Sequence, residues 1–435
     1  MTLLDDPRAG ELEGLAITAS GIDRSGPTLV PVERYISPEW MALENERLWP
    51  KVWQIACSVD HVAEPGDFYE YRAGWLSILI VRGDDGELRA FQNACRHRGN
   101  AICQGTGSGL TELRCPYHRW AWTTEGRLRE VPSRKGFGKL DNDEYGLYPA
   151  LVDTWGPLVF VNLDTNAMPL MEWLEGIPDD VSWCPIDDYR CQHQIVSPMP
   201  ANWKVVAEGF SETYHIQGIH RDMLGHIDDV DAPQKLWHRH GVSYQNYGVP
   251  SPRLGRNVPD ETVWDTWMTC MGERLGLGAG APMPEIPAGT TVQDAIARGI
   301  KAHFAEQGVD LSMHDNVRTT AMSQYNLFPN ATVLCMPDMI SVLSSRPGLT
   351  PDDCQFVMMT MKRVAPGTPR SEPITAEVPE DTSFGFVMNQ DVGIMKTAQR
   401  GLHQPGMKHL TLSAEECRVI NLHRNLDEWV NGTRP

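Results

Sequence analysis

The sequence predicts an α+β protein with two domains, one of which is a small antiparallel β domain. Short β segments separated by Gly-containing turns follow one another from Val52 to about Val161. A helical segment precedes them, and a second helix with an apolar stripe at the 3.6-residue period begins near Asn202. The chain has 435 residues, which is long enough for two domains with sizeable cores.

The composition is that of a soluble globular protein, with 41% hydrophobic and 22% charged residues. The 38 basic and 57 acidic residues give a formal charge of -19, which disfavours a nucleic-acid or anionic-membrane partner. The start of the chain lacks the basic and apolar run of a signal peptide, and apolar runs such as Trp75–Val81 are too short to cross a bilayer. We therefore expect a cytoplasmic protein, whose ten cysteines are in a reducing compartment and free to bind metal.

The N-terminal elements are predicted from capping and turn signals. Residues 1–30 have weak periodicity and are expected to form a surface arm. Ser37, followed by Pro and Glu, is typical of a helix N-terminus, and the helix should continue to about Leu48. The segments Trp75–Val81 and Leu88–Ala94 flank an Asp-Asp-Gly-Glu turn, which predicts a β-hairpin.

Two short turns in the β region each contain one Cys and one His. Their potential ligands are Cys95, His97, Cys115 and His118. A Rieske [2Fe-2S] cluster needs this division, because two Cys bind one iron and two His bind the other. A structural zinc is the alternative, since two Cys and two His also satisfy tetrahedral Zn. Zinc sites more often pair Cys with Cys in one knuckle, so the spacing favours the Rieske cluster.

A second candidate metal site lies on the helix that begins near Asn202. Its polar face carries Glu208, Glu212 and His215, which taken alone is typical of an amphipathic surface helix. His220 follows five residues after His215, and on a straight helix the two would be about 140° apart. They could bind one metal only if the helix breaks, and we expect a break or bulge near Gly218.

In combination, these motifs resemble those of Rieske non-heme iron oxygenases, in particular the large (alpha) subunit of the ring-hydroxylating oxygenases. Residues 95–99 match the family's Cys-Arg-His-Arg-Gly box. Residues 115–120 match its Cys-Pro-Tyr-His-Gly-Trp box except at Arg119, where Gly is common. The resemblance covers essentially the whole chain, because the Asn-Trp-Lys segment, the two-His motif and a late Asp follow in the expected order.

The resemblance implies a Rieske domain over residues 48–165 and a catalytic domain over residues 1–47 and 166–435. The catalytic domain would be of the helix-grip type, with helices packed on a curved antiparallel sheet. It would bind mononuclear Fe(II) through a facial triad of two His and one carboxylate. In this sequence the triad would be His215, His220 and Asp391, and Asp381 is the weaker competitor for the acid. The structural alternative is that Asp391 lies in the first turn of a helix, where its negative charge interacts favourably with the helix dipole.

The resemblance also assigns roles around the iron. A carboxylate three residues before the first His ligand usually bridges the cluster of one subunit and the iron of its neighbour, and here that residue is Glu212 rather than the common Asp. Glu at this position resembles a branch that includes carnitine-type monooxygenases. Glu208 and Gly209 are candidate substrate-pocket residues. Gly209 replaces an Asn that ring dioxygenases often carry, which we expect to open space beside the iron.

The predicted function is the terminal oxygenase of a multicomponent system that inserts oxygen from O2 into a small organic, aromatic substrate. Monooxygenation of a quaternary ammonium or methoxylated compound is the alternative. The chain lacks a Gly-rich dinucleotide fingerprint, so electrons from NAD(P)H would come through a separate reductase, with or without a ferredoxin. The family also implies a homotrimer, sometimes with a small beta subunit. The alternatives of other classes are a Rieske electron carrier and a zinc-stapled binding protein.

Overall fold

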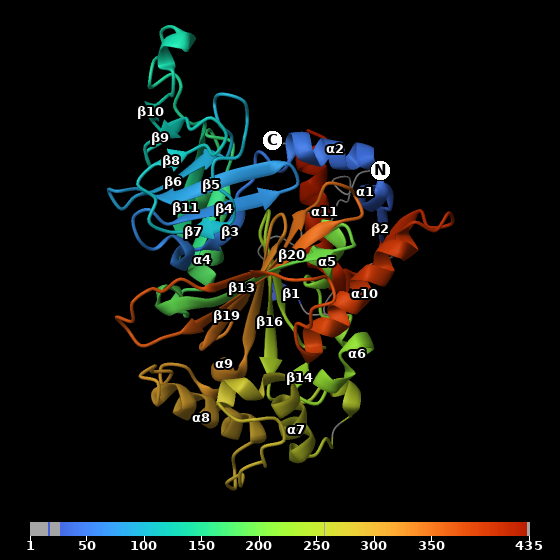
Figure 1. Cartoon of the computed structure of the whole chain (residues 1–435). Coiled ribbons are helices and arrows are strands. Elements are labelled where there is room, and N and C mark those ends of the chain that lie inside the picture. Colours follow the sequence, from blue (N-terminus) through green and yellow to red (C-terminus); the bar gives the residue numbers. More distant parts are fainter. Residues whose placement is uncertain (1–15, 18–26, 256, 433–435) are drawn as a thin grey trace. The chain divides into compact units, whose positions relative to one another are not determined.

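The structure is a computed structural model that describes residues 16–17, 27–255 and 257–432 (Figure 1). The chain divides into two compact units, which are described separately. The smaller unit consists of residues 42–174 and 369–374. The larger unit consists of residues 1–41, 175–368 and 375–435. The predicted Rieske range, 48–165, lies inside the smaller unit.

The smaller unit contains two antiparallel sheets. The first has seven strands in the order β3-β12-β11-β6-β5-β4-β7. These strands are β3 (Gln54–Ser58), β4 (Phe68–Ala73), β5 (Leu76–Arg82), β6 (Leu88–Gln92), β7 (Thr106–Gly107), β11 (Pro149–Trp155) and β12 (Leu158–Asn162). The second sheet has the order β10-β9-β8, with β8 (Leu113–Arg114), β9 (Ala121–Trp122) and β10 (Leu128–Glu130). The unit also contains α3 (Leu170–Trp173), η4 (Val59–Val62) and η5 (Arg134–Phe137).

The predicted hairpin is present as β5 and β6, and β5 is buried on both faces. Ile78 and Ile80 belong to one hydrophobic core. Leu79 and Val81, which point to the opposite face, belong to a second core that also contains Cys95. Because successive side chains of a strand alternate between faces, a continuous apolar run of this kind supports two cores at once. The second core therefore forms the base on which the Cys-containing turns rest.

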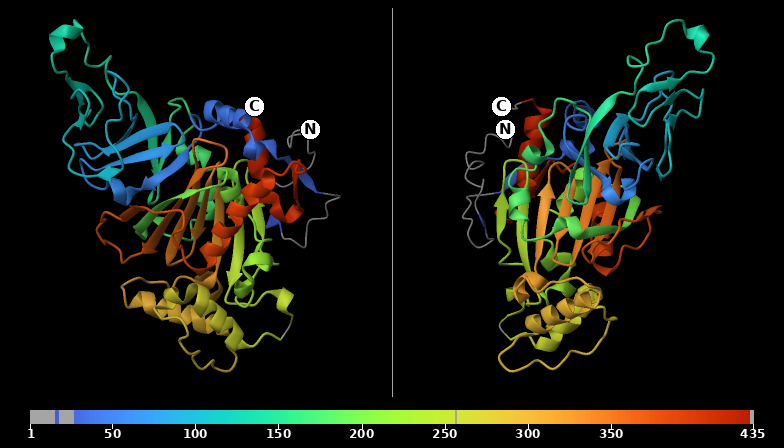
Figure 2. Two further views of the ribbon diagram at one scale, coloured as in Figure 1. Left: turned by 45° about the vertical axis from the view of Figure 1, so that its right-hand side comes forward. Right: turned by 90° about the vertical axis from the view of Figure 1, so that its left-hand side faces the viewer.

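The larger unit is built on one curled antiparallel sheet (Figure 2). Within the described residues it has ten strands, with a main path of β1-β15-β16-β17-β18-β19-β20-β13-β21 and with β14 paired to β16. The strands are β1 (Ala16–Ile17), β13 (Tyr189–Met199), β14 (Ile227–Asp228), β15 (Gln234–Leu236), β16 (Gly241–Tyr247), β17 (Met322–Leu327), β18 (Ala331–Cys335), β19 (Met339–Pro347), β20 (Cys354–Arg363) and β21 (Ile374–Glu377). A separate pair joins β2 (Thr28–Pro31) to β22 (His409–Leu412).

Helices gather on one side and at one end of this sheet (Figures 1 and 2). On one side lie α5 (Trp203–Gly209), α6 (Ile216–Ile219) and α10 (Phe386–Leu402), and at one end of the strands lie α7 (Asp260–Met271), α8 (Val292–Ala305) and α9 (Asn316–Thr320). The remaining helices in the described part of the chain are α1 (Glu33–Ile36), α2 (Pro38–Arg47), α4 (Ile177–Asp180), α11 (Cys417–Val430), η6 (Ile186–Asp188), η7 (Arg221–Met223), η8 (Pro252–Leu254), η9 (Gly272–Leu275) and η10 (Ala414–Glu416). This arrangement confirms the predicted α+β class, with helices on a curved antiparallel sheet.

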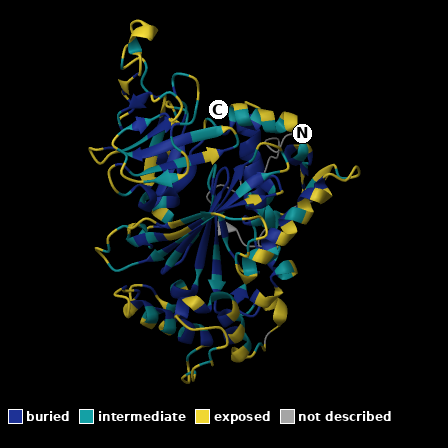
Figure 3. Cartoon of the chain, viewed as in Figure 1, coloured by how far each residue is buried: buried dark blue, intermediate teal, exposed yellow. Residues whose placement is uncertain are grey.

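Buried residues fill the strands of both units, whereas exposed residues concentrate in loops and on the outer faces of helices (Figure 3). An exception is α11, in which every residue is buried, including its charged ones. Arg34 on α1 forms an ion pair of 2.7 Å with Asp427 on α11, and both side chains are almost fully buried. A buried charge needs such a partner, because removing an ion from water is costly.

Two local predictions require correction. The helix predicted from Asn202 onward begins as expected, with the Asn202 side chain accepting a hydrogen bond from the N–H of Lys204, but α5 ends at Gly209. The break therefore lies over residues 210–215, before the first His rather than near Gly218. The predicted surface arm is also partly wrong, because Val30 in β2 is fully buried; residues 1–15 and 18–26 lie outside the described residues.

Within the described residues, every helix is too short or too polar to cross a membrane.

One buried histidine makes the stability of the larger unit depend on pH. Both ring nitrogens of His226 are buried without a hydrogen-bond partner within the described residues, and burial lowers its pKa to about 3. The unfolded chain binds a proton at this residue near pH 6.5, whereas the folded chain does so only near pH 3. The stability that the neutral ring provides is therefore fully present above pH 6.5 and is lost as the pH falls toward 3.

We expect the free energy of unfolding to fall by about 2 kcal/mol between pH 7.5 and pH 5 because of His226 alone. The variant His226→Leu should lose this part of the pH dependence, since it has no group to protonate. Guanidinium unfolding curves at the two pH values measure the effect, with His409→Ala as a control at an exposed histidine. An equal pH dependence in wild type and His226→Leu would contradict the assignment.

Candidate functional site

The first of the two turns that contain the predicted cluster donors, residues 95–100, is closed by two backbone hydrogen bonds. The N–H of Cys95 donates to the carbonyl of Asn100 at 2.8 Å, and the N–H of Gly99 donates to the carbonyl of Cys95 at 2.9 Å. Gly99 has a φ of 75°, in the left-handed region that favours glycine. This closure holds the side chains at positions 95 and 97 on one side of the turn.

The second metal turn repeats the same closure. The N–H of Cys115 donates to the carbonyl of Trp120 at 2.9 Å, and the N–H of Arg119 donates to the carbonyl of Cys115 at 3.1 Å. Arg119 therefore occupies the position that Gly99 has in the first turn, and its φ is 63°. The departure from the family box puts a side chain at a backbone conformation that costs about 1–2 kcal/mol for an L-residue.

The four predicted donors converge between the two turns. The thiols of Cys95 and Cys115 are buried and free, and the pKa of Cys95 is raised, first by burial and further by the neighbouring Cys115. The rings of His97 and His118 lie 4.6 Å apart at an angle of 75°, and Trp120 stacks on His97. The Nδ1 atom of His97 is buried with no hydrogen-bond partner in the described part of the chain. An orphaned imidazole nitrogen beside two buried thiols fits a metal cluster, which would satisfy all of these atoms.

We expect Arg119→Gly to stabilise the smaller unit by about 1 kcal/mol, because glycine adopts the left-handed conformation without a Cβ clash. Arg119→Ala is the matched control, since it removes the long side chain but keeps the Cβ. The loss of cluster absorbance in increasing guanidinium measures local unfolding. Equal shifts for the Gly and Ala variants would show that the side chain, and not the backbone, is responsible.

The second set of predicted donors also lies together. His215, His220 and Asp391 each offer one ligand atom within 4.8 Å of the others. The Nε2 atom of His220 lies 2.9 Å from Oδ1 of Asp391, and that of His215 lies 3.8 Å from the same oxygen. The two His flank the short helix α6, as its N-cap and C-cap, so the break before His215 is what turns both rings inward. The competitor Asp381 is exposed and lies outside this group.

In both histidines of this set, the other ring nitrogen, Nδ1, is hydrogen-bonded to a side-chain acceptor. The Nδ1 atom of His215 lies 2.6 Å from Oε1 of Glu212, and that of His220 lies 2.7 Å from Oε1 of Gln390. Each Nδ1–H donates to its acceptor, so in the neutral ring Nε2 carries a lone pair. That lone pair of His220 faces the oxygen of Asp391, and two acceptors at 2.9 Å repel each other unless a cation lies between them. The donor set therefore fits a divalent metal.

Sequence reasoning did not single out Gln390. Its signal was its position next to Asp391 on α10, but the partner ring at His220 is 170 residues away in the sequence. An amide next to a carboxylate on a helix is common, so only the fold could assign it a role.

Glu212 and His215 form a buried hydrogen-bonded couple. Besides the contact to the ring, Oε2 of Glu212 accepts the backbone N–H of His215 at 2.9 Å. Burial raises the pKa of Glu212, but its bonds to His215 outweigh burial and the pKa is lowered. Burial lowers the pKa of His215, but the hydrogen bond and charge of Glu212 outweigh it and the pKa is raised. Such a carboxylate makes the imidazole a more basic ligand.

A cavity of about 920 Å³, a volume that includes its mouth, opens on the three donors. Alternate residues of four neighbouring strands supply its wall, because residues two apart on a strand share a face. They are Gln245 and Tyr247 on β16, Met322 and Gln324 on β17, Leu334 next to Met336 at the end of β18, and Met339, Ser341 and Leu343 on β19. The cavity is the space available to a substrate beside the donors.

A second cavity, of about 780 Å³ including its mouth, shares His215 and Asp391 of the donor set with the first. Glu208 lines this cavity but not the first, and its Oε1 is 2.8 Å from both the hydroxyl of Tyr35 and Nε2 of His423. Gly209 and Glu212 line both cavities. Of the two predicted pocket residues, only Gly209 therefore lies on the wall of the first cavity.

The expectation that Gly209 opens space beside the iron is not met. A Cβ at Gly209 would lie 2.6 Å from the methyl group of Met395 on α10. The missing side chain is therefore filled by Met395, and glycine allows α5 and α10 to approach closely.

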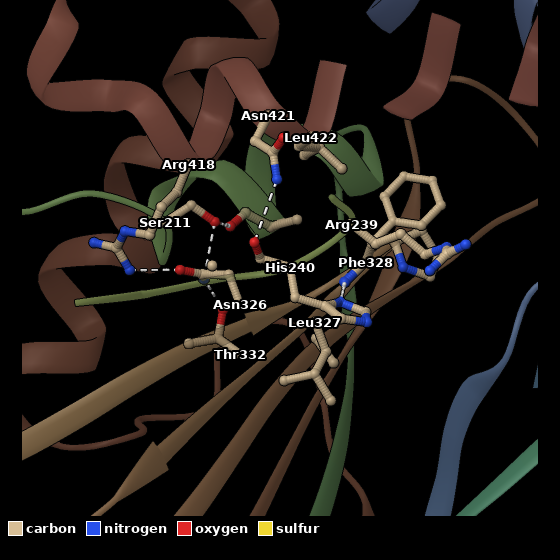
Figure 4. A pocket seen from close by; sticks show the side chains of 14 residues that line it. Ser211, Arg239, His240, Asn326, Leu327, Phe328, Thr332, Arg418, Asn421 and Leu422 are labelled. Atoms are coloured by element: carbon tan, nitrogen blue, oxygen red, sulfur yellow. Dashed lines mark hydrogen bonds between the residues drawn. The ribbon is translucent and has the colours of Figure 1, made fainter. Parts of the chain in front are cut away.

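A third, smaller hollow, of about 340 Å³ including open solvent, is lined in part by α11, and many of its lining groups are bonded to one another (Figure 4). Arg418 donates to Asn326 at 2.5 Å, and Asn326 in turn donates to the hydroxyl of Ser211 at 3.1 Å. This network ties α11 and β17 to the break after α5, so it supports the segment that carries Glu212 and His215.

Two family models match the chain. The model described as ring hydroxylating alpha subunit (catalytic domain) matches residues 186–432, and the model described as Rieske [2Fe-2S] domain matches residues 52–146. The chain is also 30% identical over 226 residues to the carnitine monooxygenase oxygenase subunit of Escherichia coli (strain K12), a match that covers 51% of this chain. The match spans 59% of that relative's length.

Two solved structures have a similar fold. A quaternary ammonium Rieske monooxygenase in complex with L-carnitine has a TM-score of 0.66 at 16% identity, over 97% of each chain. Naphthalene 1,2-dioxygenase from Rhodococcus sp. has a TM-score of 0.64 at 19% identity, over 94% of this chain and 95% of that one. At these identities the likeness is one of fold. The catalytic-domain match over residues 186–432 covers more than half of the chain, which therefore belongs to the ring-hydroxylating alpha subunit family and carries a Rieske [2Fe-2S] domain before its catalytic domain.

Proposed function

We propose that this chain is the terminal oxygenase component of a multicomponent Rieske oxygenase. It would receive electrons that originate in NAD(P)H through a separate reductase, with or without a ferredoxin, and use them with O2 to oxidise a small organic substrate. The single observation that carries the proposal is the convergence of His215, His220 and Asp391 within 4.8 Å on the wall of a cavity. A ligand set of two imidazoles and one carboxylate is typical of non-heme iron oxygenases.

We propose Cys95, Cys115, His97 and His118 as the ligands of the [2Fe-2S] cluster, and the triad above as the ligands of the mononuclear iron. When bound, the cluster supplies one-electron storage and the mononuclear iron supplies oxygen activation.

The chain's own residues prepare the site for this chemistry. Glu212 and Gln390 hold Nδ1 of the two triad imidazoles, so that both Nε2 atoms point to one place. Asp391 is buried and contributes the oxygen from α10. The apolar wall of the cavity excludes water from the open side of the donor set, and a substrate bound there lies directly beside it.

Glu212 is proposed to connect His215 to a cluster histidine of a neighbouring subunit in a homotrimer, with or without a small beta subunit. Its two oxygens both contact His215, and its side chain lines both cavities. A carboxylate in this position can accept a hydrogen bond from a second imidazole without releasing the first, because each oxygen has two lone pairs.

The electron donor is proposed to be an acidic protein. Residues 95–139, which include both metal turns, contain nine Arg or Lys and three Glu, although the whole chain has a charge of -19. Arg98, Arg119 and Lys135 are exposed, and none of them forms an ion pair with another described residue. Charge complementarity of this kind speeds the encounter of two proteins.

Two substrate classes follow from the relatives. The Escherichia coli relative and the structure with L-carnitine favour a quaternary ammonium compound, and the naphthalene dioxygenase fold favours an aromatic ring. A Rieske electron carrier, the alternative of another class, would need only the smaller unit. The donor triad and the catalytic-domain match support the oxygenase instead.

The test is oxygen consumption with a surrogate reductase across neutral aromatics, aromatic acids and quaternary ammonium compounds, combined with product analysis. We expect substrate-dependent oxygen uptake with an oxygenated product in at least one class. A colourless protein that contains zinc and no acid-labile sulfide, even after reconstitution, would end the proposal.

A further inference from the structure

The three donors of the second metal site come from two separate segments of the larger unit. His215 and His220 flank α6 and follow the break after α5, whereas Asp391 lies on α10. One ligand atom of each lies within 4.8 Å of the others, so a small shift of α5 against α10 would separate them. The contacts that hold these two helices in place therefore decide whether the three donors can bind one ion.

The backbone of Tyr35 on α1 contacts both of these helices. Its carbonyl accepts a hydrogen bond from Nδ2 of Asn202, the N-cap of α5, at 3.0 Å. The same carbonyl accepts a hydrogen bond from Nε2 of Gln399 on α10 at 3.4 Å. The side-chain oxygen of Gln399 in turn accepts the backbone N–H of Asn202 at 3.0 Å. Residue 35 therefore ties the start of α5 to α10.

The side chain of Tyr35 contacts the other end of α5. Its hydroxyl donates to Oε1 of Glu208 at 2.8 Å and lies 2.8 Å from Nε2 of His423 on α11. Nε2 of His423 is also 2.8 Å from that oxygen of Glu208, so the three polar atoms contact one another. Burial lowers the pKa of His423, and its Nδ1 faces Nη1 of Arg34 at 3.4 Å. Because arginine only donates, Nδ1 is the acceptor of the neutral ring, and Nε2–H donates to Glu208.

The surroundings of this polar contact are apolar and closed to water. Tyr35 and His423 are both 0% exposed. The core around Tyr35 also joins the same helices, because it contains Leu402 of α10 and Val419 of α11, with Val205 of α5 packed against it. Hydrogen bonds in such a place hold their geometry well, since water does not compete for the donors.

We propose that Tyr35 and Glu208 are positioning residues of the mononuclear metal site. The contact between the hydroxyl and the carboxylate holds the last turn of α5, and with it the segment that leads to His215, in register with α10 and Asp391. Neither residue belongs to the donor group itself. The inference rests on the proposed function, because it concerns the same metal ligands. It gives Glu208 a supporting role instead of the substrate contact expected from the sequence.

The affinity for Fe(II) tests the inference without turnover. Protein with an oxidised cluster and an emptied mononuclear site is titrated with Fe(II) under anaerobic conditions, and the EPR spectrum of the nitric oxide adduct reports the ligand geometry. Tyr35→Phe keeps the ring in the core and removes only the hydroxyl. We expect Fe(II) binding to weaken by about three- to tenfold and the EPR signal to broaden, because the donors no longer share one geometry. Unchanged affinity and spectrum would overturn the inference.

Tyr325→Phe is the matched control for a general loss of stability. Tyr325 is also 0% exposed, and its hydroxyl donates at 2.9 Å to the carboxylate of Asp180, which belongs to α4 rather than to α5 or α10. Both variants should lower the guanidinium midpoint of unfolding by similar amounts, but only Tyr35→Phe should weaken Fe(II) binding. Equal weakening in the two variants would overturn the inference, because lost stability would then explain both.

Variants of Glu208 separate positioning from charge. Glu208→Gln still offers an oxygen to Tyr35 and His423, so it should keep most of the Fe(II) affinity. Glu208→Leu offers none and should weaken binding as much as Tyr35→Phe. The double variant Tyr35→Phe with Glu208→Leu should bind no more weakly than either single variant, because both remove the same contact. A loss in Glu208→Gln as large as that in Glu208→Leu would assign the effect to charge and overturn the positioning role.

The proposed function and this inference fail in different ways. Wild-type protein that binds no Fe(II) at the second site would refute the proposed function, and the inference with it. Wild-type protein that binds Fe(II) and takes up oxygen with substrate, together with unchanged Fe(II) binding in Tyr35→Phe, would refute the inference alone.

Discussion

Replacing His215 with alanine should abolish product formation while the [2Fe-2S] absorbance and EPR spectra stay unchanged. The physical reason is that His215 belongs to the donor set with His220 and Asp391 in the larger unit, whereas the cluster turns lie in the smaller unit. Two donors hold a divalent metal far less tightly than three, so the variant should bind one iron fewer per chain. Iron and acid-labile sulfide analysis of the purified protein measures this directly.

The matched control for His215→Ala is His409→Ala, which changes an exposed histidine of the same unit and should keep full activity. The variant His215→Gln tests whether any side chain of similar length is enough. Full turnover in His215→Ala would exclude this residue as an iron ligand. Loss of the cluster spectrum together with activity would point to unfolding instead.

Glu212→Gln should slow electron delivery to the catalytic centre by about 10- to 100-fold, while reduction of the cluster by an external donor stays normal. The amide of Gln can still accept a hydrogen bond from the N–H of His215. It lacks the negative charge of Glu212, which stabilises the pair of Glu212 and His215 and makes the imidazole more basic. Single-turnover kinetics with stopped-flow detection of cluster oxidation in the presence of substrate separate the two steps.

Glu212→Asp and Gln390→Leu are the control variants for this experiment. Glu212→Asp keeps the carboxylate and should recover much of the rate. Gln390→Leu removes the support of the other histidine, His220, and should weaken iron binding without slowing electron delivery in iron-loaded molecules. A rate that Glu212→Gln leaves unchanged would remove Glu212 from the electron path.

Much of the local structure could be read from the sequence because its causes are local. The hairpin of β5 and β6 follows from a turn with glycine at the position that needs a φ of 83°. The N-caps at Ser37 and Asn202 follow from side chains that reach a backbone N–H two or three residues ahead. The donors of the cluster site were recognisable because one Cys and one His in each of two short turns have few other uses together. The donors of the second site were predicted only through the resemblance to the oxygenase family.

The position of the helix break could not be predicted from such patterns. The apolar stripe starting at Trp203 continues to Phe210, which favours a continuous helix, yet α5 ends at Gly209. The carbonyl of Phe210 instead accepts hydrogen bonds from Gln324 and Asn326 on β17, more than 100 residues later. These long-range hydrogen bonds replace the helical ones. Because their donors lie far from residue 210 in the sequence, the local sequence around residue 210 does not reveal them.

By itself, the sequence predicted the α+β class and the four cluster donors, because these depend on residue type and spacing along the chain, whereas the triad of His215, His220 and Asp391 was predicted only through the resemblance to a family. Only the tertiary structure decided what surrounds them: Gln390 behind His220, and Met395 in the space beside Gly209. The reason is that each of these contacts or cavities joins elements far apart in the chain. The energies of these contacts depend on which surfaces the curled sheet brings together. The pattern of residues along the chain does not specify which surfaces those are.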